Sequence, residues 1–203
     1  VVVSWFVIAL LTIGSYVLTR GIKDVPPNQV LTGRLGIAEL VVEGITSLVD
    51  SSMGKANRGF VPFIGSLALY LVFANLIGLV GLKTPTSDIN TTLGLAAIVF
   101  VMIQYKSIQS KGFVNYLKGF TEPIFIMTPM NIFSELTTPI SMAFRLYGNM
   151  LAGMLILGLL YMFLPVPVGI PVVFHFYFDL VSGLIQTFIF VMLAATYISN
   201  AMN

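Results

Sequence analysis

The chain has 203 residues, of which 57% are hydrophobic and only 9% are charged. Soluble domains carry roughly 25% charged residues, so a water-soluble globular fold is excluded. The net charge of +2 is too small to indicate a nucleic-acid-binding surface. The chain has no cysteine, which excludes disulfides and thiolate sites, and its single histidine leaves little for a metal site.

Several stretches without charged residues are long enough to cross a bilayer, which takes about 20 helical residues. The first lies within residues 1–20, which we interpret as a membrane helix and not as a signal peptide. A transmembrane hairpin is predicted at residues 60–105. A pair of long helices, joined by a proline-rich turn, is predicted at residues 130–203. We therefore expect an all-α integral membrane protein of one domain, residues 1–203, with about five membrane helices.

Residues 28–57 differ in character, because charged side chains alternate there with Leu, Ile and Val. The charged residues are Arg34, Glu39, Glu43, Asp50 and Lys55. Such a segment fits an amphipathic helix at the membrane surface better than a spanning helix. The sequence therefore predicts an interfacial helix between the first two membrane helices.

The orientation follows from the basic residues, since Lys and Arg concentrate on the cytoplasmic side. If the N-terminus lies outside and five helices alternate, Lys83 falls outside and Arg145 lies within the membrane. All the other basic residues fall inside: Arg20, Lys23, Arg34, Lys55, Arg58, Lys106, Lys111 and Lys118. We therefore expect an outside N-terminus and a cytoplasmic C-terminus.

One helix of the last pair carries an arginine at a costly position. Placing a cation in mid-membrane costs about 2.5 to 3.5 kcal/mol on insertion scales. Steps of four, three, four and four place five polar residues on one face: Ser134, Thr138, Ser141, Arg145 and Asn149. Gly148, Ala152 and Gly153 extend this face with small residues, which let another helix come close.

A second polar stripe lies on the last helix, with spacings of four, three and four: His175, Asp179, Ser182 and Gln186. Two such stripes in one small membrane protein suggest an ion path. Other interpretations stay open. Arg145 and Asp179 could form a buried ion pair that only fixes helix packing. Asn149 and Gln186 could be interhelical hydrogen-bonding residues, and His175 could be an interfacial residue.

The residues around the arginine resemble a known signature. The run from Thr138 to Gly153, TPISMAFRLYGNMLAG, resembles that of subunit a of rotary F-type ATP synthases, where a P-x-S-x-x-x-R-L-x-G-N pattern carries the essential arginine. Residues 185–190, IQTFIF, are similar to the family's I-Q-A-F-I-F. Residues 73–79, FANLIGL, are similar to its N-L-L-G-L segment. The resemblance covers essentially the whole chain.

The resemblance implies a non-catalytic stator subunit without cofactor or metal, whose two long helices lie strongly tilted against a ring of c subunits. Two aqueous half-channels would pass ions to and from the ring carboxylates. The ring-facing residues would be Ser141, Arg145, Gly148, Asn149, Ala152 and Gly153. The implied partners are the c-subunit ring, the peripheral stalk b subunits, other ATP synthase subunits and the lipid bilayer. The implied location is a bacterial plasma membrane.

The implied ion-translocation residues are Arg145, Asn149, Asp179, Gln186, Ser182, His175 and Glu135. Arginine keeps its proton, so Arg145 would attract a ring carboxylate and separate the half-channels without relaying a proton. Asp179 is predicted as the ionisable station of the outer half-channel. Met154 stands where many family members have a carboxylate or histidine of the relay. Glu135 is a candidate for the inner entrance, or else only a carboxylate near a helix start.

The coupling ion stays open between proton, the commoner ion in this family, and sodium, because the ion-selective site belongs to the ring. A secondary transporter would show repeated halves or more helices. An intramembrane hydrolase would need converging groups, whereas Ser182, His175 and Asp179 share one helix face. There is no P-loop pattern, so the chain is not expected to perform phosphate chemistry itself.

Overall fold

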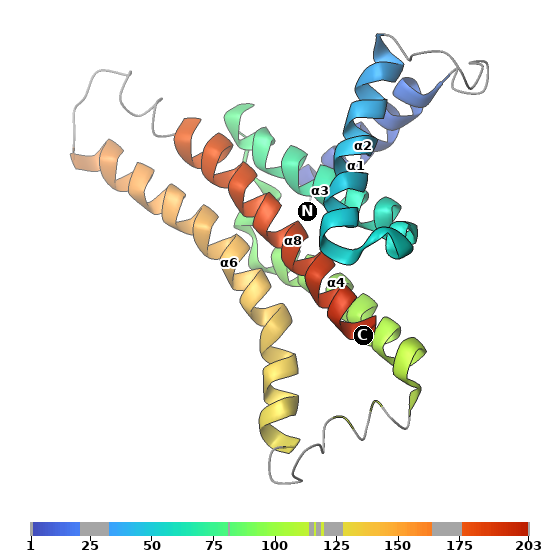
Figure 1. The fold of residues 1–203 in the computed structure, drawn as a ribbon. Coiled ribbons are helices and arrows are strands. Elements are labelled where there is room, and N and C mark those ends of the chain that lie inside the picture. Colours follow the sequence, from blue (N-terminus) through green and yellow to red (C-terminus); the bar gives the residue numbers. More distant parts are fainter. Residues whose placement is uncertain are drawn as a thin grey trace.

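The computed structural model describes residues 2–20, 33–80, 82–113, 116, 119, 128–163 and 176–202. For five of these it describes the backbone alone: Arg34, Val80, Phe163, Phe178 and Asp179. Throughout the described residues the regular structure is helical and no strand occurs (Figure 1). This confirms the predicted all-α fold.

The longer helices are α1 Val2–Thr19, α2 Arg34–Met53, α3 Val61–Leu76, α4 Ile89–Lys111, α6 Thr128–Phe163 and α8 Gly183–Met202. Shorter helical segments are η2 Lys55–Phe60, η3 Ile77–Val80, η4 Pro85–Ser87 and the π-helical η6 Tyr177–Ser182. Within the described residues, five helical stretches are long and apolar enough to cross a membrane: Val2–Thr19, Lys55–Leu79, Ile89–Lys111, Thr128–Met162 and Leu180–Met202. This number agrees with the prediction of about five membrane helices.

Helix α2 is not one of the five candidate spans, and it lies between two glycines. Gly33 precedes it with φ 69° and Gly54 follows it with φ 80°, a left-handed conformation that glycine adopts without steric cost. Exposed apolar side chains such as Leu40 occupy its first half, whereas Val49 and Met53 are buried in the core. Only the last part of α2 is therefore anchored in the core of this chain.

The hydrophobic core is built around α8, which contacts α2, α3, α4 and α6 (Figure 1). Its buried side chains are Phe190, Val191, Ala194, Ala195 and Ile198. Ala194 and Ala195 are fully buried, and such small residues let neighbouring helices approach closely within a membrane. The last helix is thus the central element of the fold.

Contacts between helix ends fix which ends lie together. Lys106 Nζ is 5.2 Å from the centroid of the Phe60 ring, so the start of α3 lies beside the end of α4. Ser110 Oγ donates a hydrogen bond of 2.7 Å to the carbonyl of Met202, so the end of α8 also lies beside the end of α4. Arg58 lies just before α3 and Lys111 ends α4, so both residues lie at this end of the molecule. Helices that cross a membrane in alternating directions would place them on the same side.

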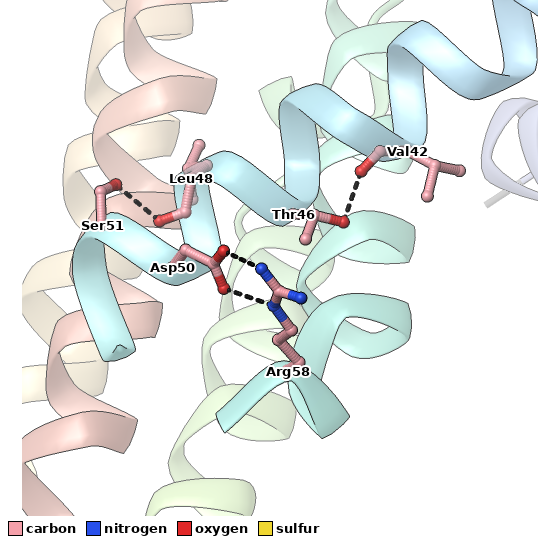
Figure 2. Close-up of polar contacts among 6 residues, drawn as sticks. All are labelled: Val42, Thr46, Leu48, Asp50, Ser51 and Arg58. Atoms are coloured by element: carbon pink, nitrogen blue, oxygen red, sulfur yellow. Dashed lines mark hydrogen bonds and ion pairs between the residues drawn. The ribbon is translucent and has the colours of Figure 1, made fainter. Parts of the chain in front are cut away.

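An ion pair joins α2 to the segment after it (Figure 2). Arg58 donates from Nε to Asp50 Oδ1 at 2.9 Å and from Nη2 to Asp50 Oδ2 at 2.6 Å. This bidentate hydrogen bonding holds the pKa of Asp50 below its ordinary value. Because Arg58 is exposed, the pair orients η2 against α2 more than it stabilises the fold.

Candidate functional site

The arginine stripe lies on α6, the longest helix. At 1.5 Å per residue its 36 residues span about 54 Å, more than the roughly 30 Å of a bilayer core. The helix is bent in Figure 1 and contains Pro139, which removes a backbone hydrogen bond and crowds the preceding turn. It begins at Thr128, two residues before the predicted boundary at 130, and continues through this proline.

Arg145 lies on an outward face of α6. Its side chain is exposed, as are those of Ser141 and Phe144, whereas Ala143 and Leu146 are buried in the core. Among the side chains that the structure describes, none forms a hydrogen bond or an ion pair with Arg145. Among the described side chains the guanidinium therefore has no partner and lies on an exposed face, an arrangement that leaves it available to a counter-ion.

The two predicted stripes meet at Asn149 and Ser182. Ser182 Oγ donates a hydrogen bond of 2.9 Å to Asn149 Oδ1, across 33 residues of sequence. Gln186 follows Ser182 by one helical turn and is 7% exposed. Its Nε2 is buried and has no hydrogen-bond partner among the described residues. A buried donor without a partner is costly, so this part of the contact between α6 and α8 suits a hydrogen-bond acceptor such as water.

The remaining stripe residues of the last helix are only partly described. Asp179 lies in the π-helical turn η6, of which the structure gives the backbone at this position. Its predicted side-chain role, and its alternative pairing with Arg145, lie outside the described side chains. His175 and the proline-rich turn lie outside the described residues. Single π-helical turns occur frequently at functional sites, and this one immediately precedes Ser182 and Gln186.

The small-residue face of α6 is narrower than the sequence predicts. Ala152 is exposed, and a Cβ added at Gly148 would meet no atom within 4 Å. Gly153, in contrast, is buried within the chain and is not open to an outside partner. The reason is helical geometry: at about 100° per residue, Ala152 lies within about 20° of Arg145 but Gly153 about 80° away.

A second polar region lies at the end of the molecule that holds Lys111. A cavity of about 330 Å³ is lined by Ser107, Lys111, Tyr116, Gly119, Asn131, Ser134, Glu135 and Thr138. Another of about 270 Å³ shares Ser107, Lys111, Glu135 and Thr138 and reaches the last turn of α8 at Asn200. Glu135, Ser134 and Thr138 come from α6, so one helix carries both the arginine and this polar cavity.

Glu135 is the centre of a hydrogen-bonded group in this cavity. Gln104 Nε2 donates to Glu135 Oε1 at 2.7 Å. The hydroxyl of Tyr116 donates to Gln104 Oε1 and lies 3.4 Å from Glu135 Oε1. Burial first, and then the charge of Glu135, raise the pKa of Tyr116 above its ordinary value. The phenol therefore stays protonated and acts as a donor.

Sequence reasoning missed three residues of these regions. Gln104 and Tyr116 were not predicted as site residues, although Gln104 is the first polar residue after the apolar run 93–103. Asn75 was noted only within a family-like segment, yet it is buried and hydrogen-bonded to α8. Within the described residues, no group of three His, Asp or Glu side chains that could hold a metal ion occurs.

Comparisons with known proteins agree over nearly the whole chain. The sequence model of the family described as ATP synthase A chain matches residues 1–199. "ATP synthase subunit a 1" of Crocosphaera subtropica is 36% identical over 206 aligned positions, covering 100% of this chain and 86% of the relative. "ATP synthase subunit a" of Trichlorobacter lovleyi is 35% identical, with the same coverage. "ATP synthase subunit a, sodium ion specific" of Propionigenium modestum is 33% identical, covering 100% and 73%.

Proposed function

The chain belongs to the family of ATP synthase A chains, the non-catalytic membrane-sector subunits of ATP synthase, and we propose that it passes protons through two half-channels to and from the carboxylates of a c-subunit ring. The ions would drive rotation of the ring, coupled to ATP synthesis. The observation that carries this proposal is Arg145, a permanent cation open on an outward face of α6 without a partner among the described side chains.

In the proposed mechanism Arg145 faces the ring and attracts each ring carboxylate as it arrives. The attraction favours the ionised carboxylate, so the ion already bound there is released. Because arginine does not give up its proton, Arg145 separates the two half-channels and does not short-circuit them. Ser141, Gly148, Asn149 and Ala152 are the proposed neighbours of this contact, whereas buried Gly153 serves packing within the chain.

The proposed outer half-channel runs along α8 towards Arg145. His175 and Asp179 form its outer part, and Asp179 is its ionisable station. Ser182, Asn149 and Gln186 continue the path. The hydrogen bond between Ser182 and Asn149 and the unpartnered Nε2 of Gln186 support this assignment. Met154 is exposed and cannot relay a proton, so water must bridge the step that a second carboxylate performs in other members.

The proposed inner half-channel opens through the cavity around Glu135. Polar residues line this cavity, and it lies at the end of the molecule that holds Lys106 and Lys111. Glu135 supplies the carboxylate of the group that is hydrogen-bonded with Gln104 and Tyr116. A carboxylate there can accept the ion that a ring site releases and pass it to water. Lys111 lines the same cavity, so a cation also stands at the proposed inner end of the path.

The gathering of Lys and Arg residues at the end of the molecule that holds Lys106 and Lys111 supports an outside N-terminus and a cytoplasmic C-terminus. With this orientation α2, within the segment 28–57, would lie at the cytoplasmic membrane surface, and α6 and α8 would lie tilted against the ring. We propose the c-ring, the peripheral stalk b subunits and the other ATP synthase subunits as partners. Bacterial relatives support a location in the plasma membrane.

Sodium is the second candidate for the coupling ion, because one relative is described as sodium ion specific. The two candidates are separated by ATP-driven ion uptake in proteoliposomes that hold the complete complex. Acidification that a protonophore abolishes and that ignores sodium indicates protons. Sodium uptake that survives or rises with protonophore indicates sodium.

The same assay tests the proposed path. Arg145→Ala should abolish coupled pumping, and unchanged pumping would return Arg145 to a structural role. Asp179→Asn should strongly reduce pumping. If this variant pumped as the wild type does, Asp179 would not be the outer station. Asp88→Asn is the matched control, because Asp88 caps the start of α4 and lies outside the proposed path.

A further inference from the structure

A buried amide on α3 makes an unusually complete set of hydrogen bonds. Asn75 is 1% exposed. Its Nδ2 donates to the carbonyl of Gly183 and to Oγ1 of Thr187, both at 3.0 Å, and its Oδ1 accepts from Thr86 Oγ1 at 2.8 Å. A buried amide is tolerated only when its polar atoms are paired, and every polar atom of this side chain is paired.

The partners of Asn75 lie on segments that are distant in the sequence. Gly183 and Thr187 belong to the first turn of α8, more than 100 residues away, and Thr86 belongs to η4 between α3 and α4. Thr187 Oγ1 also donates to the Gly183 carbonyl at 2.9 Å, which closes the network. One side chain therefore joins three elements at the start of α8.

Gly183 permits this close approach. A Cβ added at Gly183 would lie 3.1 Å from Asn75 Cβ, tighter than almost all real contacts. Gly183 is also the residue at which the π-helical turn η6 ends and α8 begins. Because a π-helical turn departs from the α-helical register, the rotation of α8 about its axis depends on how this junction is held.

Ser182, the residue before the junction, is hydrogen-bonded to a different helix from the one that holds Gly183. Ser182 donates to Asn149 of α6 at 2.9 Å, while Gly183 accepts from Asn75 of α3. Adjacent residues of one turn are thus held from two sides, and Gln186 lies one turn further on, buried and with no partner for its Nε2 among the described residues. Directional hydrogen bonds define a rotation more sharply than apolar contacts do.

From this geometry we infer that Asn75, with Thr86 and Thr187, is a positioning residue of the ion path. It holds the π-to-α junction so that Ser182, Gln186 and the turn that carries Asp179 point towards α6. Asn75 itself touches no ion, since its polar atoms are all engaged within the chain. The inference rests on the proposed function, because it concerns the placement of the proposed outer half-channel.

The test uses the complete complex in proteoliposomes and measures ions taken up per ATP hydrolysed, normalised to assembled complex. Thr86→Val and Thr187→Val remove one hydroxyl each at nearly constant volume and should lower this ratio at least about threefold, because buried partners are left unpaired. Thr86→Ser and Thr187→Ser keep the hydroxyl and should restore the ratio. Asn75→Leu should lower it further, and the threonine variants keep the test valid if Asn75→Leu does not assemble.

Thr92→Val is the matched control. Thr92 is fully buried, but within the described part of the chain its hydroxyl bonds only to the carbonyl of Ile89 in its own helix, so the ratio should stay at the wild-type value. The inference is overturned if Thr86→Val and Thr187→Val match Thr92→Val, or if the serine variants fail as the valine variants do. Arg145→Ala, assayed beside these variants, reports on the proposed function. Normal pumping in Arg145→Ala would overturn the proposed function and, with it, the inference about Asn75.

Discussion

Ser182 on the last helix and Asn149 on α6 are joined by a hydrogen bond of 2.9 Å. Each residue belongs to one of the two polar stripes, and Asn149 follows Arg145 by one helical turn. The bond therefore fixes the second stripe next to the turn that carries the arginine. In the proposed path, this is the contact through which an ion moving along α8 would reach the neighbourhood of Arg145.

Ser182→Ala should weaken this connection without unfolding the subunit. Interhelical hydrogen bonds in membranes contribute about 0.6 kcal/mol on average, about a threefold change in an equilibrium. We expect ATP-driven uptake per assembled complex to fall by about this factor. Ser66→Ala is the control, since Ser66 is exposed and, as far as the structure describes the chain, its hydroxyl bonds only to the Phe63 carbonyl of its own helix. Equal uptake in both variants would contradict the assignment of Ser182.

Glu135→Gln should slow ion transfer on the side of Lys111. The change keeps the volume and a hydrogen-bonding group but removes the charge at the centre of the cavity. We expect pumping to fall about tenfold, which corresponds to about 1.4 kcal/mol in the barrier, and Glu135→Asp to recover part of it. Glu39→Gln, an exposed change on α2, should pump normally. A wild-type rate in Glu135→Gln would leave Glu135 as a structural carboxylate.

Tyr116→Phe should have an effect that does not depend on pH in the working range. The raised pKa means that the folded state favours the protonated phenol. Its hydrogen bonds are therefore fully present below the ordinary tyrosine pKa of about 10 and are lost only as the pH rises through the still higher folded value. The ratio of variant to wild-type pumping should be constant from about pH 6 to about pH 9. A ratio that rises towards one within this range would show that the phenol ionises there.

Gly148→Leu should disturb an external contact and leave the subunit itself folded. A Cβ added at Gly148 meets no atom within 4 Å among the described residues, and a longer side chain would project beside Arg145 into the proposed ring contact. We expect membrane insertion of the subunit to be normal and coupled pumping, or assembly with the ring, to fall at least about tenfold, about 1.4 kcal/mol. Gly14→Leu, equally open but on α1, is the control. Normal coupling in Gly148→Leu would move the ring contact to another face.

The sequence was sufficient for the helices and the family. Long runs without charged residues need no tertiary information, because the bilayer itself requires about 20 apolar helical residues. The pattern around Arg145 identified the family without a structure, and the matched family model confirms it. The boundaries were less exact: α6 begins before residue 130 and passes through Pro139, because neighbouring helices can compensate the hydrogen bond that a proline removes.

The candidate site was only partly predictable. Stripe spacing placed Asn149 on one polar face and Ser182 and Gln186 on another, since helical periodicity alone puts residues on one face, and the structure joins Asn149 to Ser182. It misjudged Gly153, because periodicity cannot tell which part of a face other helices of the chain cover.

Tertiary structure alone decided which distant residues meet. The group of Glu135, Gln104 and Tyr116 and the network of Asn75 with Gly183 join helices whose relative rotation no single segment determines. The π-helical turn before Gly183 changes the register of the last helix. Sequence thus determined the elements and the position of Arg145 in a family-like pattern, whereas helix packing decided which polar groups surround the proposed path, because hydrogen bonds between helices depend on approach and rotation to within an ångström.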